Sequence, residues 1–235
     1  MSETLHLNLP YLEAAQAQKH VTVNEALRAL DALVQLSVKD RTLAAAPGSP
    51  GEGDRYIVAS GATGGWAGAD GKVAAFVDGA WGFFAPEAGW RAYDEAAGAY
   101  VHHDGTGWAA EPAALSPHGA ATEFGIIEGD HAIVAGATND TGFDIPDRAI
   151  VLGVTGRVLT AVTGATSWNL GVAADATRYG TGIGVAAGST VIGPSGTPVT
   201  YWGATPLRLS SVGGDFTGGS VRLSIHYVML AGAGA

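Results

Sequence analysis

The chain of 235 residues is long enough for one or two domains with real cores, and 47% hydrophobic against 14% charged residues excludes an intrinsically disordered chain. Its net charge of −10, with only twelve basic residues, argues against a nucleic-acid partner, because phosphate contacts need clustered Lys and Arg. The absence of cysteine excludes disulfides, thiol chemistry and Cys-ligated metals.

The N-terminus, MSETLHLNLP, lacks the basic start and the apolar core of a secretion signal. No apolar run approaches the roughly 20 residues that are needed to span a bilayer. We therefore expect a protein that is made in the cytoplasm, does not insert into membranes, and leaves the cell by lysis or as part of a particle.

We divide the chain into three parts: residues 1–40, 41–118 and 119–235. In the first part, leucines alternate with polar residues before Pro10, which predicts a short extended arm. In the second, Asp-Gly pairs followed by aromatic residues predict tight hairpin turns, and hence a small antiparallel meander over residues 55–110. Prolines and small residues just before residue 119 mark a linker.

The first part also holds the best helical pattern of the chain. Thr22 and Glu25 have the spacing of a capping box, in which each side chain bonds a free backbone amide at the helix start. Apolar side chains then recur at intervals of three and four, which predicts an amphipathic helix Val23–Leu36. One apolar stripe cannot bury itself, so the helix packs on a sheet or on copies of itself. The expected oligomer or capsid contacts are Leu27, Leu30, Leu33 and Val34.

The third part reads almost wholly as short strands separated by turns, at the spacing of a β-sandwich. The last strand alternates apolar and other residues over Val221–Leu230, so one of its faces lies in a core. The predicted strands are 126–127, 131–134, 148–154, 157–162, 167–172, 199–202, 207–211 and 221–230.

The common catalytic motifs are absent from the sequence: there is no G-x-S-x-G elbow, P-loop lysine motif or H-E-x-x-H. The glycine run Gly180–Gly184 lacks the strand–helix context of a nucleotide site. His102, His103 and Asp104 lie at an Asp-Gly turn, where polar residues are expected in any case. We therefore expect no catalytic residues, no cofactor and no metal.

Carboxylates leave one enzymatic alternative open. Asn139–Asp147 is dense in oxygen ligands, but its order is not that of a calcium loop, and turn capping by Asn and Asp explains it. Glycoside cleavage needs two carboxyls about 5 to 10 Å apart. The candidate carboxylates for such a pair, among which the sequence gives no way to choose, are Asp140, Asp144, Asp147, Asp175 and Asp215.

Aromatic residues in the third part suggest a binding function instead. Trp and Tyr fall in or beside turns, with Asp and Arg close in sequence, and flat rings flanked by planar polar groups suit sugars. The same amphipathic rings also suit core packing and oligomer contacts, and that alternative stays open for each of them. The candidate carbohydrate-binding residues are Trp168, Asp175, Arg178, Tyr179 and Trp202.

The motifs of residues 9–110 resemble a family of tailed-phage proteins found in alphaproteobacterial prophages and gene transfer agents, formerly a domain of unknown function. The resemblance rests on Leu9-Pro10-Tyr11, on the string AQAQKHVT at residues 15–22, and on a second block beginning at Gly51 and including Trp66. Residues 154–180 are similar to a receptor-facing domain at the end of such proteins.

The resemblance implies a structural virion component. Family members in gene transfer agents are head spikes that sit on capsid vertices and bind the capsular polysaccharide of the recipient cell; others are tail or fibre proteins. We therefore expect an α+β N-terminal attachment module followed by a β-sandwich of jelly-roll type. The expected partners are capsid or other virion proteins, further copies in a trimer or pentamer, and cell-surface polysaccharide.

The expected location is the particle surface, and the family brings no catalytic residues. Two alternatives remain open: a structural connector without glycan binding, and a capsule depolymerase.

Overall fold

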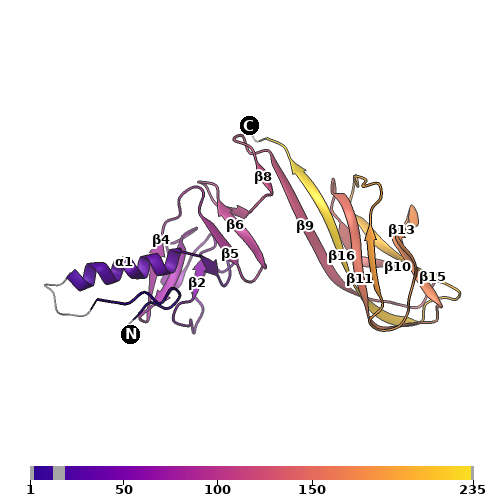
Figure 1. Ribbon diagram of the computed structural model, residues 1–235, viewed down its shortest axis with the longest axis horizontal. Coiled ribbons are helices and arrows are strands. Elements are labelled where there is room, and N and C mark those ends of the chain that lie inside the picture. Colours follow the sequence, from indigo (N-terminus) through magenta and orange to yellow (C-terminus); the bar gives the residue numbers. More distant parts are fainter. Residues whose placement is uncertain (1–2, 13–18, 234–235) are drawn as a thin grey trace. The chain divides into compact units, whose positions relative to one another are not determined.

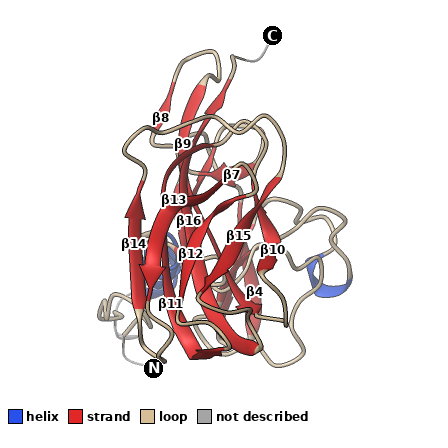
Figure 2. Ribbon diagram, turned by 90° about the vertical axis from the view of Figure 1, so that its right-hand side faces the viewer, coloured by secondary structure: helices blue, strands red, loops and turns tan. Residues whose placement is uncertain are grey.

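The computed structural model describes residues 3–12 and 19–233, and it is mainly β, as predicted (Figures 1 and 2). The chain divides into two compact units, Met1–Glu111 and Pro112–Ala235. Both the arm and the helix belong to the first unit together with its strands. An independent role for residues 1–40 stays a prediction.

The first unit contains two small sheets. One has the order β1-β5-β6-β7, with β1 and β5 parallel, and the other is the antiparallel sheet β2-β3-β4. The single meander predicted for residues 55–110 is therefore wrong, because the chain changes sheet after β4. The elements are α1 (Lys19–Leu33), β1 (Ser37–Val38), β2 (Arg55–Ile57), the 3-10 helix η1 (Gly64–Trp66), β3 (Val73–Val77), β4 (Ala80–Phe84), β5 (Arg91–Asp94), β6 (Ala99–His103) and β7 (Trp108–Ala110).

The helix exists as predicted, but both of its ends differ. It begins at Lys19, so Thr22 lies about one turn inside it and does not act as a cap. It ends at Leu33 because Gln35 adopts a left-handed conformation with φ of 51°, which a continuing helix does not permit. Within the described part of the chain, no helix combines the length and hydropathy needed to cross a bilayer.

The predicted extended arm is wrong as well, because residues 5–7 form a turn that is bonded to the helix. The backbone amides of His6 and Leu7 donate hydrogen bonds to the carboxylate of Asp31, at 3.1 and 2.6 Å. Burial alone would raise the pKa of Asp31, but these bonds and one from the Thr4 hydroxyl outweigh it and lower the pKa. The charged carboxylate therefore fastens the arm to α1.

A buried arginine fixes the other end of α1. The guanidinium of Arg55 donates to the main-chain carbonyls of Asp31 and Ala32, at 3.4 and 3.3 Å, and to the Ser37 hydroxyl at 2.9 Å. These carbonyls lie at the negative end of the helix dipole, where a cation is favourable. Arg55 thus joins the last turn of the helix to β2.

One predicted hairpin is confirmed in detail. Asp78 and Gly79 connect β3 to β4 and both have positive φ, 53° and 74°. Two central residues with positive φ define the turn type that matches the twist of a two-residue hairpin, which explains the Asp-Gly pair.

The second unit is a sandwich whose strands pair as nested antiparallel partners. β9 pairs with β16, β10 with β15, β11 with β14, and β12 with β13. The two sheets have the orders β14-β11-β16-β9-β8 and β10-β15-β12-β13. This is the strand order of a jelly roll, as predicted. The strands are β8 (Ala114–Leu115), β9 (Ala121–Ala132), β10 (Thr138–Ile145), β11 (Ile150–Thr163), β12 (Ser167–Val172), β13 (Asp175–Ile183), β14 (Thr190–Pro194), β15 (Thr205–Val212) and β16 (Gly218–Ala231).

Four of these strands were not predicted. β8 lies in the stretch that was assigned to the linker. β10 falls in the Asn139–Asp147 segment that was assigned to a turn, and β13 contains the Gly180–Gly182 run. β14 is a short edge strand of five residues that ends in Gly193 and Pro194, which are uncommon in strands. Conversely, residues 199–202 form a single bridge, Ile150 with Thr200, and no strand. Segments rich in glycine or carboxylates have low strand propensity, so they were not recognised as strands. Their strand structure depends on pairing with neighbours distant in sequence.

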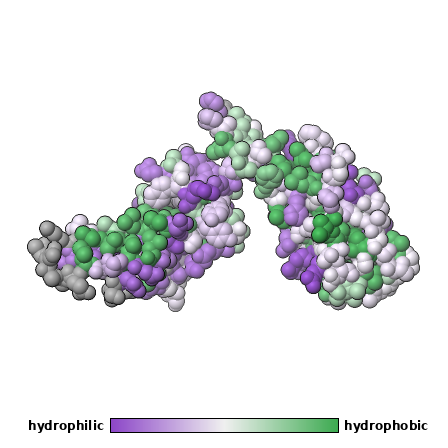
Figure 3. Space-filling model, in the orientation of Figure 1, coloured by the Kyte–Doolittle hydropathy of each residue, from purple (hydrophilic) through white to green (hydrophobic). Residues whose placement is uncertain are grey.

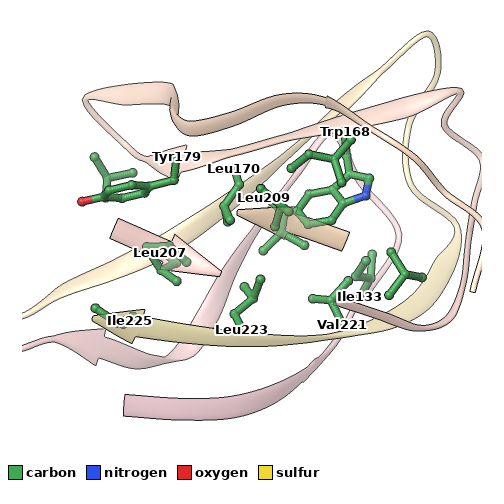
Figure 4. Packing of buried hydrophobic residues seen from close by; sticks show 14 of the residues in the cluster. Ile133, Trp168, Leu170, Tyr179, Leu207, Leu209, Val221, Leu223 and Ile225 are labelled. Carbon is green, nitrogen blue, oxygen red and sulfur yellow. The ribbon is translucent and has the colours of Figure 1, made fainter. Parts of the chain in front are cut away.

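The core of the sandwich lies between the two sheets (Figure 4). Val221, Leu223 and Ile225 of β16 point inward and are fully buried, as the predicted alternation requires. Leu207 and Leu209 of β15 meet them from the other sheet. The first unit has two smaller clusters, one around Val38 and Val73 and the other around Trp66.

We predict that Asp31→Ala lowers the free energy of unfolding by about 1–3 kcal/mol at pH 7, because it leaves two backbone amides without their acceptor. Since the folded-state pKa of Asp31 is lowered, this contribution is present above about pH 4 and is lost as the pH falls through the folded-state pKa. Urea unfolding followed by tryptophan fluorescence at pH 7 and pH 3 measures the difference, which should shrink at pH 3.

Glu25→Gln is the matched control, since Glu25 is an exposed carboxylate on the same helix. It should change stability by less than about 0.5 kcal/mol. Equal stability of Asp31→Ala and the native chain at pH 7 would contradict the anchoring role.

Candidate functional site

Two of the five candidate sugar-binding residues belong to the core of the sandwich. Trp168 and Tyr179 are 1% and 2% exposed, and Figure 4 shows both rings between the two sheets. The indole Nε1 of Trp168 donates to the Gly184 carbonyl at 3.1 Å. A ring with both faces covered cannot stack on a sugar, so the prediction that these two residues contact sugar is corrected.

The hydroxyl of Tyr179 lies 2.7 Å from the hydroxyl of Tyr201. Burial, followed by the hydrogen bond to Tyr201, raises the pKa of Tyr179 well above its ordinary value. The pair is a neutral internal link between β13 and the segment 195–204 that joins β14 to β15.

The other three candidates lie toward one end of the sandwich. Val172 of β12 pairs with Asp175 across the β12–β13 turn, and Ile145 of β10 pairs with Thr205 at the start of β15. Since β12 and β10 both flank β15, these pairings bring the loops 146–149, 173–174 and 195–204 to the same end. We call this the Trp202 end.

Trp202 stands out from this end because of the residue before it. The ring of Tyr201 packs against the core, and successive side chains of an extended segment point in opposite directions. Trp202 is accordingly 83% exposed. Two backbone bonds hold the segment: the Arg148 amide donates to the Tyr201 carbonyl at 2.6 Å, and the Tyr201 amide donates to Ala149 at 3.1 Å.

The Trp202 end also includes two charged residues that were not among the candidate binding residues. Arg148 and Asp147 occupy the loop from β10 to β11, with side chains 76% and 58% exposed and 3.7 Å apart. Arg148 has a positive φ of 64°, an uncommon conformation for a residue with a side chain, and such strain gathers at functional loops. Their position directly after Pro146, between two strands, is the only sequence signal that marks them.

Asp175 and Arg178 take part in the local structure. The carboxylate of Asp175 accepts bonds from the amide and hydroxyl of Thr177, at 3.1 and 3.2 Å. The guanidinium of Arg178 donates to the Thr197 carbonyl at 2.8 Å and lies 5.9 Å from the centre of the Tyr179 ring. Arg178 therefore helps to hold the 195–204 segment, and part of it remains exposed.

Together, the Trp202 end offers a flat exposed indole with guanidinium and carboxylate groups on neighbouring loops. An indole can stack on the apolar face of a ring, and planar charged groups can form paired hydrogen bonds with hydroxyls. The arrangement can bind a polyhydroxylated ligand on an open surface.

The predicted contact residues of α1 divide into two sets. Leu33 is partly buried and packs against the core around Val38. Leu30 and Val34 are 51% and 42% exposed, and Leu27 lies between them and the similarly exposed Val23. The residues 23, 27, 30 and 34 thus form one exposed apolar stripe, visible as apolar colouring over α1 in Figure 3.

A hollow of ≈ 350 Å³ lies beside this helix, between α1 and the hairpin β3–β4. Ala32, Trp81 and Phe84 supply apolar walls, and Arg28 of α1 meets Asp78 of the hairpin at 2.5 Å. Arg28 and Ala32 lie on another face of α1 than the stripe, so the hollow is separate from it. The exposed stripe alone is a surface that a partner's apolar side chains can occupy.

The carboxylates considered for glycoside cleavage lie in different environments, one ion-paired and others exposed. Asp140 is bonded to the guanidinium of Arg208 by two contacts, 2.6 and 2.7 Å, and this lowers its pKa. Asp144 is exposed on β10, and Asp215 is exposed before β16. Within residues 3–12 and 19–233, no group of three or more His, Cys, Asp or Glu residues is arranged to hold a metal ion.

Residues 23–109 match the model of a family described as a protein of unknown function, DUF2793. This range lies inside the first unit and inside residues 9–110, whose motifs resemble the tailed-phage family. A solved chain from the cyanophage Pam1 capsid asymmetric unit is 26% identical; the alignment covers 51% of this chain and 94% of that chain, with a TM-score of 0.34. No curated protein matches the chain.

We predict that the two tryptophans of the sandwich contribute very differently to its stability. Trp168→Ala removes a fully buried ring and should lower the free energy of unfolding by about 3–5 kcal/mol. Trp202→Ala removes an exposed ring and should change it by less than about 0.5 kcal/mol. Thermal unfolding followed by circular dichroism compares the two variants, and a large loss for Trp202→Ala would show that Trp202 is a structural residue.

Proposed function

We propose that the protein is a structural component of a phage-type particle, the head spike or fibre of a gene transfer agent or tailed phage, that binds cell-surface polysaccharide. The first unit attaches the protein, and the Trp202 end of the sandwich binds the glycan. Binding occurs without cleavage. The observation that carries the proposal is the exposed Trp202 on a loop fixed by Tyr201, with charged side chains on the adjacent loop.

The geometry of the Trp202 end supports glycan binding over a purely structural role. Trp202 presents a large flat aromatic ring that is open to a ligand. The loop that bears it is fixed through the Tyr179–Tyr201 pair, so the backbone at Trp202 is held in place before binding. Arg148 and Asp147 extend the contact to hydroxyl or carboxylate groups of the polymer.

Attachment through the first unit is supported by the stripe on α1. Four apolar positions spaced by four, three and four residues form a seam of the kind that packs against other helices. The motif resemblance of residues 9–110 to a virion family agrees with this assignment. The occupant of the stripe is another virion protein or a further copy of the chain.

We predict that the full-length protein binds at least one member of a panel of purified bacterial capsular polysaccharides, and that polymer length does not change. Trp202→Ala should weaken this binding about tenfold or more, equivalent to about 1.4 kcal/mol, because a stacking surface is lost. Biolayer interferometry measures the affinity, and size-exclusion chromatography measures polymer length. Tyr100→Ala, which removes a 55% exposed ring from the first unit, is the control.

Each other outcome points to a different function. Shortened polymer indicates a depolymerase. Absence of binding across the panel leaves a connector. Undiminished binding by Trp202→Ala would move the site elsewhere, for instance to the ≈ 430 Å³ hollow lined by Arg41, Asp70 and Trp108 in the first unit.

Attachment is tested with particles from the producing bacterium. We predict that the native protein sediments with the particles, whereas Leu30→Glu stays in the supernatant, because a charge in the stripe opposes burial. Val134→Glu places the same charge at an exposed position of the second unit, and it should sediment normally. Sedimentation of Leu30→Glu at the native level would exclude the stripe as the attachment surface.

A further inference from the structure

One sheet of the sandwich, β14-β11-β16-β9, has an outer face with a regular arrangement of side chains. The register places the outward residues of the four strands in level rows. Of these strands, β9, β16 and β11 are seen side by side in Figure 1. The first row is Phe124, Val228 and Ile150; the second is Ile126, His226, Gly153 and Pro194; the third is Glu128, Ser224, Thr155 and Ile192; the fourth is Asp130, Arg222, Arg157 and Thr190.

The apolar rows expose large side chains to an unusual degree. Phe124 and Ile126 of β9 are 67% and 64% exposed, and Ile192 of β14 is 80% exposed. Soluble proteins seldom leave several large apolar side chains together on one face unless a partner covers them. The inner face of the same strands packs in the core of the sandwich. The exposed side chains therefore lie on the outer face of a complete, folded sheet.

The two sides of this face have complementary shapes. Phe124 and Ile126 project from β9 at one side. At the other side, β11 and β14 form an apolar hollow of ≈ 200 Å³, whose lining includes Leu152, Ile192 and Pro194. Gly153 and Pro194, which border the hollow, lie in the same row as Ile126.

The charges are complementary in the same sense. β9 carries Glu128 and Asp130, and β11 carries Arg157. Asp130 is already bonded to Arg222, but Arg157 stands directly opposite Arg222 in the register and makes no ion pair within the described residues. Like charges in that position repel each other, so an acidic side chain on another molecule would stabilise Arg157 electrostatically.

We propose that this face is an interface between copies of the chain, in which β9 of one copy packs against β11 and β14 of the next. A rotation axis parallel to the strands keeps the rows level, so Ile126 of one copy meets the hollow of the next. The same rotation brings Asp130 to the level of Arg157 and leaves Glu128 one row away, a diagonal distance that a long side chain can span. Such head-to-tail contacts close into a ring.

A copy turned end for end would not match. It would place the apolar first rows of one molecule over the charged fourth row of the other, and buried charges without partners are costly. The arrangement is independent of glycan binding, because it uses the outer face of the sheet rather than the Trp202 end.

The absence of natural cysteine permits a direct test on the full-length protein. Within one copy, Ile126 and Ile192 are separated by three strand spacings, about 14 Å, too far for a disulfide. The double variant Ile126→Cys/Ile192→Cys should therefore crosslink only between copies. We expect a ladder on non-reducing electrophoresis that ends at one ring size, while either single variant gives no ladder.

Val134→Cys/Ile192→Cys is the matched control, since Val134 is as exposed as Ile126 but lies outside the face. Dimers formed by a single-cysteine variant would overturn the head-to-tail contact in favour of a symmetric one. Absence of a ladder in the double variant would overturn the interface altogether.

A charge exchange tests the same contact without crosslinking. Arg157→Glu and Glu128→Arg should each raise the dissociation constant about tenfold, and the double variant should restore it, as sedimentation equilibrium can measure. Arg157→Glu also removes the repulsion from Arg222, so each copy stays folded. Failure of the double variant to restore association would contradict the proposed pairing.

Discussion

The pairing of β9 with β16 is the constraint on which the second unit depends. Twelve consecutive residue pairs run from Ala121 with Ala231 to Ala132 with Ser220. They join the first strand of the nested set to its last, so the roll is closed only when this pairing forms. A shift by one residue would turn the buried face of β16 to water and the exposed face to the core.

Several features of the unit follow from this register. It fixes Leu223 and Ile225 inside and Ile126 outside, and so creates both the core and the apolar outer face. Trp202 owes its exposure to Tyr201, whose ring is held inside by Tyr179. A rigid core thus determines which side chains are available at the surface.

The first unit is organised by different contacts, centred on charged groups with little access to water. Asp31 bonds the arm to α1, and Arg55 bonds the end of α1 to the sheet. Removing either group leaves partners without hydrogen bonds inside the protein, which costs more than the bonds contribute when made. These contacts hold α1 with its apolar stripe exposed.

Short sequence patterns correctly predicted those features that depend only on residues close together in the sequence. The Asp78-Gly79 hairpin and the alternation of β16 depend on neighbouring residues, and both are confirmed. The C-terminal end of α1 was missed because Gln35 ends the helix through its backbone conformation rather than through a glycine or proline.

The candidate site shows the same limit. Trp168 and Trp202 both lie in or beside turns by sequence, yet one is buried and the other exposed. Their difference arises from long-range pairing, since β12 lies between β15 and β13 while residue 202 lies in a connecting segment. Arg148 joins the site through a bond to Tyr201, 53 residues later, which no local pattern signals.

In the proposed function, the polysaccharide binds at the Trp202 end of the jelly roll. Amide hydrogen exchange of the full-length protein, with and without a bound capsular polysaccharide, tests it most directly. Binding at this end should slow exchange in loops 146–149 and 195–204 and leave exchange in β12 and β16 unchanged. Protection confined to the first unit, with both loops unaffected, would contradict it.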